Sequence, residues 1–231
     1  MAGNAALDQA PGWYGKLSTL GDFASRRLLP ETVRALDAWL AAGMHSSQSQ
    51  LGETWLPAYL GSPLQRFVLG PGVLDASWWF GVLMPSCDKV GRYFPLVVLQ
   101  SRAAPPSERF ALDHLELWWQ RAAEAALETL AESVDVERFE RVLSELPPWP
   151  GARDTWAWAE AALEPAAACE VPADSSLTVV SQALAVASWA QRLQRASLWW
   201  SWRPQGGATS CRIVAGLPAA DQFAEMFGSS I

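Results

Sequence analysis

The sequence predicts an α+β fold in which a largely antiparallel sheet is flanked by helices. Two apolar runs, Trp78–Met84 and Phe94–Leu99, contain no charged residue and are rich in residues that suit a strand covered on both faces. Several other segments show amphipathic helical patterns, and an amphipathic helix needs an apolar surface to cover. The predicted strands are joined by tight turns and not by repeated βαβ units, which favours antiparallel pairing.

The first part of the chain predicts a short strand, a turn and two helices. Gly12–Leu17 is the strand, with a glycine that allows close backbone approach, and Ser18–Phe23 is the turn. Pro30 opens a helix, because its fixed φ suits the first helical position. Residues 46–50 are polar enough to fray. The first helix is expected to bury one stripe, formed by Val33, Leu36, Leu40 and Met44. A second short helix follows and ends at Gly61, with Leu51, Trp55 and Tyr59 on one face.

The rest of the chain predicts one more strand, three helices and a final hairpin. Leu64–Leu69 is a strand, followed by the hairpin of the two apolar runs. A long helix after Pro105 is expected to bury Leu112, Leu115, Trp119, Ala122, Ala126 and Leu130. Asp135 is suited to cap the next helix. The remaining predicted elements are a helix over Ser181–Arg195, strands over Ser197–Trp202 and Cys211–Val214 joined across Gly206–Gly207, and a short helix over Ala219–Phe227.

The 231 residues predict a single domain, because no internal repeat or low-complexity linker is visible. Residues 1–11 are expected to form a flexible N-terminal tail, and residues 12–231 the domain. Residues 146–173 are rich in proline and alanine, and we interpret them as an irregular excursion with one short helix near Thr155–Leu163.

Composition argues against several classes of function. The net charge is −7, and Lys16 and Lys89 are the only lysines, which disfavours nucleic-acid binding. The N-terminus has neither the basic start nor the apolar core of a signal peptide, and no apolar stretch is long enough to span a membrane. Three cysteines without a CxxC pair indicate a reducing compartment. We therefore expect a cytoplasmic protein.

Fourteen tryptophans make this residue the compositional outlier, and several occur in adjacent pairs, such as Trp78–Trp79. We interpret them as core residues, because neighbouring residues of a strand point to opposite faces and so a pair serves both covered faces of a sheet. Stacking platforms for a small ligand are the alternative.

The search for catalytic motifs is negative. The sequence contains no GxGxxG, GxxxxGK[ST], HExxH or GxSxG pattern, and its two histidines, His45 and His114, are isolated. We therefore expect no enzyme activity, no cofactor and no metal. One rival stays open, a hydrolase or phosphatase that uses Asp22 and Asp88 around a metal ion.

Two polar clusters stand out as candidate binding residues: Gly21, Asp22 and Phe23 with Arg26 and Arg27, and Ser86, Asp88, Lys89, Gly91 and Arg92. One interpretation is a network that fixes turns, in which Asp22 or Asp88 pairs with an arginine across the loops, Arg66 being a further candidate. The other is a partner-docking surface or an anion site.

At these residues the chain resembles the TagF (ImpM) family, which is associated with type VI secretion. The resemblance rests on GWYGKLSTLGDFASRRL from Gly12, SPLQRFVL from Ser62, WWFGVLMPSCDKVGRYFPLVV from Trp78, SLWWSW from Ser197 and a later GLP. These blocks span the chain from Gly12 to about Phe227; residues 146–173 match no family pattern, and Trp202–Arg203 depart from it. The positions that match recurrent ones are Gly21, Asp22, Phe23, Arg27, Pro85, Ser86, Asp88, Gly91, Arg92 and Pro95.

The resemblance implies a three-layer α/β/α arrangement similar to longin- and profilin-like domains. It also implies a cytoplasmic, non-enzymatic regulator that holds type VI secretion off post-translationally with the forkhead-associated scaffold protein Fha. Our hypothesis is a binding module that engages this partner through the two polar clusters. A module that binds a small ligand such as a peptidoglycan fragment on a tryptophan-rich surface is the alternative.

Overall fold

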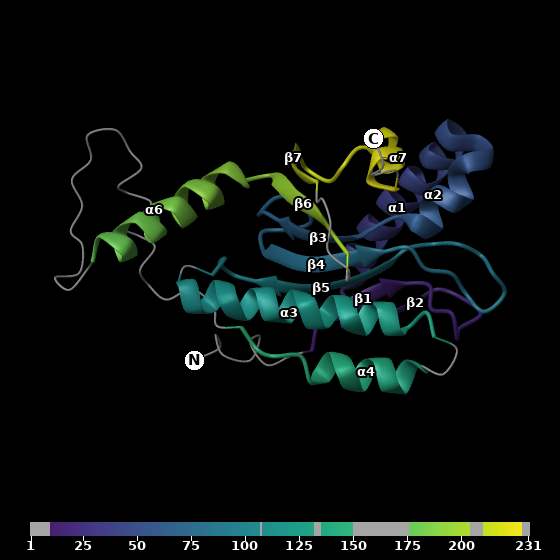
Figure 1. The fold of residues 1–231 in the computed structure, drawn as a ribbon, viewed down its shortest axis with the longest axis horizontal. Coiled ribbons are helices and arrows are strands. Elements are labelled where there is room, and N and C mark those ends of the chain that lie inside the picture. The colour runs from purple at the N-terminus through teal and green to yellow at the C-terminus, as the bar shows by residue number, and fades with distance from the viewer. Residues whose placement is uncertain (1–9, 107, 132–134, 150–175, 204–209, 228–231) are drawn as a thin grey trace.

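The computed structural model describes residues 10–106, 108–131, 135–149, 176–203 and 210–227. A seven-stranded sheet with the order β2-β1-β5-β4-β3-β6-β7 forms its centre (Figure 1). Every pairing between neighbouring strands is antiparallel. The strands are β1 Gly12–Gly15, β2 Ala24–Arg26, β3 Leu64–Leu69, β4 Trp78–Met84, β5 Leu96–Arg102, β6 Ala196–Trp202 and β7 Cys211–Ala215.

Helices cover both faces of this sheet, so the predicted fold class is confirmed (Figure 1). One face carries α1 Pro30–Leu51, α2 Trp55–Gly61 and α7 Phe223–Phe227, with the short 3-10 helices η1 Gly52–Thr54 and η2 Ala220–Gln222. The other face carries α3 Arg109–Glu128, α4 Val136–Ser144 and the C-terminal end of α6 Leu177–Arg192.

The two apolar runs form the centre of the sheet, as predicted. β4 and β5 pair from Trp78 opposite Arg102 to Met84 opposite Leu96, and all seven residues of β4 are buried. The Trp78–Trp79 pair serves both faces, since Trp78 lies in the core under α3 and Trp79 in the core under α1. Burial of an indole from water on each side is the main reason why this strand lies at the centre.

Two helix predictions need correction. Leu112 is 37% exposed, because the buried stripe of α3 is centred on Leu115, Trp118, Trp119 and Ala122, and Leu130 is 47% exposed, because α3 ends at Glu128 and Leu130 lies in the turn after it. The residues expected to fray are helical to the end of α1. Ser47 is fully buried there and accepts a hydrogen bond from Trp55 Nε1 at 3.0 Å, so a tertiary contact stabilises this polar turn.

The remaining elements occur with shifted bounds or lie outside the described residues. The helix predicted over Ser181–Arg195 is α6, Leu177–Arg192, and the run Phe94–Leu99 gives β5, Leu96–Arg102. Asp135 caps α4 and accepts a hydrogen bond from the backbone N of Arg138. The expected tail over residues 1–11, apart from Ala10 and Pro11, and most of the excursion over residues 146–173, with its short helix, lie outside the described part of the chain. The single-domain prediction stays a prediction, although the sheet combines strands from before and after that excursion.

Candidate partner-docking site

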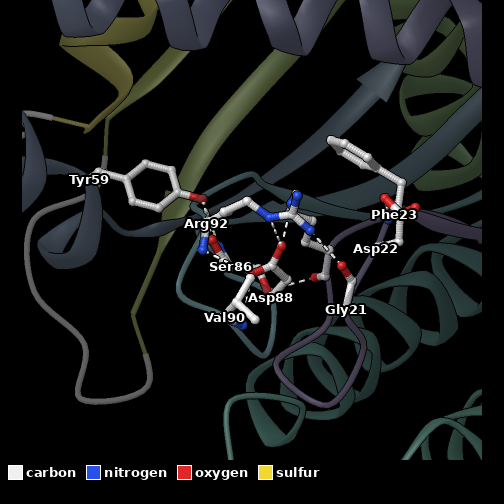
Figure 2. A network of polar contacts seen from close by, with 9 residues as sticks. Gly21, Asp22, Phe23, Tyr59, Ser86, Asp88, Val90 and Arg92 are labelled. Atoms are coloured by element: carbon white, nitrogen blue, oxygen red, sulfur yellow. Dashed lines mark hydrogen bonds and ion pairs between the residues drawn. The ribbon is translucent and has the colours of Figure 1, made fainter.

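The two polar loops predicted from the sequence lie against each other. The backbone N of Lys89 donates to Leu20 O at 2.8 Å, and Arg92 Nη2 donates to Gly21 O at 2.5 Å. Figure 2 shows the Arg92 side chain reaching from its own loop to the loop of Gly21 and Phe23. We call the segments 21–23 and 86–92 the docking loops.

Asp88 is the centre of the network that holds the docking loops. It is 2% exposed. Its Oδ2 lies 2.5 Å from Lys16 Nζ and 2.6 Å from Arg92 Nε. Its Oδ1 accepts hydrogen bonds from the backbone N of Val90 at 3.0 Å and of Arg92 at 2.9 Å. Both carboxylate oxygens therefore have two donors each.

These contacts decide the ionisation of Asp88. Burial alone raises the pKa of the carboxyl, but the hydrogen bonds from Lys16, Arg92 and Val90 outweigh it and hold the pKa well below its usual range. The carboxylate is therefore ionised, and its charge is compensated inside the loop. Asp88 pairs with an arginine, but the partner is Arg92 of its own loop, and not an arginine of another loop as predicted.

Local turn chemistry explains why this segment folds back on itself. The backbone N of Gly91 donates to Asp88 O and the backbone N of Asp88 donates to Arg92 O, each at 3.0 Å. Gly91 has a φ of 79°, a conformation that glycine adopts without the steric cost of a Cβ atom. An aspartate followed by a glycine in such a turn is the usual pattern, because the aspartate side chain bonds to nearby backbone N–H groups.

Helix α2 supports the start of the second docking loop. Tyr59 OH donates to Ser86 O at 2.8 Å and accepts from the backbone N of Ser86 at 2.8 Å (Figure 2). Burial raises the pKa of the Tyr59 phenol well above its usual value, so it is a neutral donor and acceptor. Ser86 Oγ donates in turn to Lys16 O at 2.7 Å, which connects α2 to the end of β1.

The outer side of the docking loops carries apolar and charged side chains. Phe23 is 45% exposed and Val90 is 70% exposed. The centroid of the Phe23 ring lies 4.8 Å from that of the Phe94 ring, and this contact fixes the position of Phe23. Lys89, Arg92 and Asp22 are exposed as well. Two apolar side chains near two cations and one carboxylate suit a protein partner with an apolar depression and complementary charges.

Four predicted residues do not join this network. Asp22 is exposed and accepts a hydrogen bond from the backbone N of Phe23 at 2.8 Å, and the salt bridges of the described residues do not include it. Arg26 lies on the edge strand β2 and donates to Ser25 O. Arg27 points to the opposite side, where it forms an ion pair with Glu140 of α4. Arg66 pairs with Glu116 and not with an aspartate of the loops.

The sequence interpretation missed two residues of the site, Lys16 and Tyr59. Lys16 carried a usable signal, because it is one of only two lysines and follows an apolar strand directly. A lysine that is 4% exposed needs a carboxylate partner. Tyr59 carried none beyond its helical spacing, which predicts the burial of its ring but not the partner of its hydroxyl group.

The expected core role of tryptophan holds for most of the described indoles, which are buried: Trp13, Trp55, Trp78, Trp79, Trp118, Trp119, Trp149 and Trp199. Trp119, Trp189 and Trp200 also line an open groove of about 370 Å³ between α3 and α6, with Gln182 as its one polar side chain. Within the described ranges, no three His, Cys, Asp or Glu side chains are grouped as metal ligands would be. Nor is any helix there long and apolar enough to cross a membrane.

Comparisons with known proteins agree with this fold. A family model described as the TagF N-terminal domain, type VI secretion system-associated, matches residues 12–146. The crystal structure of PA0076 from Pseudomonas aeruginosa PAO1 is similar, with 35% sequence identity and a TM-score of 0.73 over 94% of this chain and 93% of that one. A search of curated proteins gave no match. The chain therefore belongs to the TagF family of type VI secretion system-associated proteins.

Proposed function

We propose that this TagF protein is a non-enzymatic, cytoplasmic repressor of type VI secretion that acts post-translationally by binding the forkhead-associated scaffold Fha through the docking loops. Family membership supports an accessory role in this secretion system. The choice of Fha as partner, and of repression as the outcome, comes from the family resemblance of the motifs around Asp22 and Asp88.

One observation carries the choice of surface. The docking loops are held by buried, internally compensated contacts around Asp88, and they still expose Phe23, Val90, Lys89 and Arg92. A loop that is ordered before binding loses less conformational entropy when a partner binds. Exposed apolar groups beside cations supply both contact area and a charge preference.

The same contacts support a role without catalysis. Both oxygens of Asp88 already accept hydrogen bonds, two of them from the cations Lys16 and Arg92. A metal ion at Asp88 would have to displace a buried ammonium group. Repression then needs only that the bound scaffold is unable to engage its other partners, which is competitive binding.

The test is a pull-down of purified Fha with a double variant, Lys89→Glu with Val90→Asp, at two exposed residues that contact the loops through their backbone N atoms. We expect the affinity for Fha to fall by about tenfold or more, roughly 1.4 kcal/mol, and secretion to be derepressed in cells. Arg109→Glu is the matched control. It changes the net charge by −2, which equals the change made by Lys89→Glu alone and is one unit less than that of the double variant. Arg109 is 86% exposed and begins the roughly 30 Å long helix α3, whose other end lies near Ser18 and the docking loops.

A second variant, Arg92→Glu, removes an outward cation and also the contact to Gly21. We expect it to lose at least as much affinity as the double variant. If both variants fold and bind Fha as tightly as the unchanged protein, the docking loops are not the contact surface. If the Arg109→Glu control loses the same affinity, the effect is one of general charge and the proposed surface is again wrong.

The groove lined by Trp119, Trp189 and Trp200 favours a second candidate, a module that binds a peptidoglycan fragment. Its volume of about 370 Å³ is within the range of small-ligand sites. A sugar ring also needs hydrogen-bond partners, and Gln182 is the one polar lining residue. Calorimetry with muropeptides separates the two functions, because heat of binding that Trp200→Ala abolishes would support this candidate.

A further inference from the structure

A pocket lies at the far end of β5 from the docking loops. β5 rises about 20 Å from Leu96, near those loops, to Arg102. The pocket has a volume of about 150 Å³ and lies between β5, α3 and the segment after α4. Trp118, Leu143, Leu146 and Pro147 form much of its wall.

Arg102 is the one cation of this pocket, and its charge is not compensated within the described part of the chain. The residue is 6% exposed. Its Nη1 donates to the neighbouring Ser101 O at 3.1 Å, but its buried Nε has no hydrogen-bond partner among the described residues. Its guanidinium carbon lies 4.1 Å from the ring centroid of Trp149, whose indole N–H likewise has no partner in the described ranges. No salt bridge among the described residues involves Arg102.

Arg66 is a second buried arginine of this fold, and its charge is compensated by a carboxylate. The Arg66 side chain is 5% exposed, and its Nε, like that of Arg102, has no hydrogen-bond partner among the described residues, but its Nη1 lies 2.5 Å from Glu116 Oε1. Burial without such a carboxylate lowers the pKa of Arg102 to about 10, so the group is still protonated at neutral pH. A buried cation that lacks an anionic partner costs folding free energy, and binding of an anion would remove that cost.

We propose that this pocket binds a carboxylate group, held by the guanidinium of Arg102. A planar carboxylate matches the planar guanidinium donors. The single cation suits a monoanion better than a phosphate dianion. The volume equals that of about five water molecules at ~30 Å³ each, which admits a short carboxylate, and the wall of Trp118, Leu143 and Pro147 suits its aliphatic part. This site is independent of the proposed docking of Fha.

The test follows the Nε–Hε signals of the arginines in ¹⁵N–¹H spectra of the whole protein during titration with sodium propionate, against sodium chloride at equal ionic strength. Arg102→Met and Arg66→Met assign the two signals. We expect a saturable shift of the Arg102 signal and none of the Arg66 signal, which serves as the control within the same spectrum. Arg102→Met, in which binding is followed through the indole N–H signal of Trp118 in the pocket wall, is expected to weaken binding of propionate by roughly 10- to 100-fold, the loss of a charged hydrogen bond.

The result that overturns the proposal is an Arg102 signal that does not shift saturably, or that shifts no more than that of Arg66. A tighter response to inorganic phosphate than to propionate also overturns it. If Arg102→Met does not fold, Ser144→Phe narrows the pocket and keeps Arg102, and it should abolish the shift. A second titration, with a capped glutamate, tells whether the bound carboxylate belongs to a small molecule or to a protein side chain. A response at least as strong as that to propionate assigns the pocket to a carboxylate on a protein chain.

Discussion

Replacement of Tyr59 by phenylalanine isolates the contact between α2 and the docking loops. The ring stays in its surroundings, where its centroid lies 5.1 Å from that of Trp55 and 5.3 Å from that of Phe227. Only the hydroxyl group is removed, and with it both hydrogen bonds to Ser86.

The loss of stability in Tyr59→Phe depends on which hydrogen bonds remain at Ser86. Its carbonyl oxygen still accepts a hydrogen bond from the backbone N of Phe94 at 3.0 Å. Its backbone N–H, in a residue that is 3% exposed, loses its partner. A buried donor left unpaired costs about 1–3 kcal/mol. At about 2–4 °C per kcal/mol for a protein of this size, the melting temperature should fall by about 2–12 °C.

Thermal unfolding followed by circular dichroism measures this fall, and Tyr93→Phe is the control. Tyr93 lies beside Tyr59, with ring centroids 5.9 Å apart, and no hydrogen bond of its hydroxyl group occurs within the described residues. We expect the control to melt within about 1 °C of the unchanged protein, since a substitution that removes no buried contact has little effect. Equal melting temperatures for the two variants would refute the view that Tyr59 supports Ser86.

Two further predictions concern the same region. Because the folded pKa of Asp88 lies below the value of about 3.9 in an unfolded chain, its contribution to stability is present above about pH 4 and is lost as the pH falls through the folded pKa. The Asp88→Asn variant should therefore have a lower melting temperature than the unchanged protein at pH 7, and its melting temperature should change less between pH 4 and pH 2. Calorimetry measures both, and an equal pH dependence of the two proteins in this range would contradict the prediction. Gly15→Ala should cost about 2–5 kcal/mol, because a Cβ would lie 2.1 Å from Pro95 O at a φ of 142°. Urea unfolding measures it against Gly61→Ala, whose Cβ would meet nothing within 4 Å.

The sequence predicts the centre of the sheet better than its edges. β4 has the predicted bounds, because a long apolar run covered on both faces leaves few alternatives. β3 also has them, although it contains Gln65 and Arg66. β2 was missed, since its three residues Ala24–Arg26 are only partly covered and carry no alternation. Leu112 was assigned to the wrong side of α3, because the helical pattern alone does not define where the buried stripe is centred, and Leu130 was assigned to a helix that ends before it, at Glu128.

The sequence predicts individual residues of the candidate site, but not the contacts that connect them. Asp88, Gly91 and Arg92 follow from turn chemistry over a few neighbouring positions. The contact of Asp88 with Lys16 joins residues 72 positions apart, and pairing across such a separation depends on the order of strands in the sheet. Helical spacing places Tyr59 in the core, whereas its partner Ser86 belongs to another part of the chain.

The position of β3 bears on how this protein can be divided. The match to the TagF N-terminal domain ends at residue 146, but all six residues of β3 pair with β6, which begins at Ala196. A fragment that stops at the family boundary would present the buried strand Leu64–Leu69 as a bare edge, with Phe67 uncovered by Trp199. Such an edge is a template for strand addition from another molecule. Expression of that fragment should therefore give aggregates or strand-exchanged dimers, and addition of the C-terminal hairpin in trans should restore solubility.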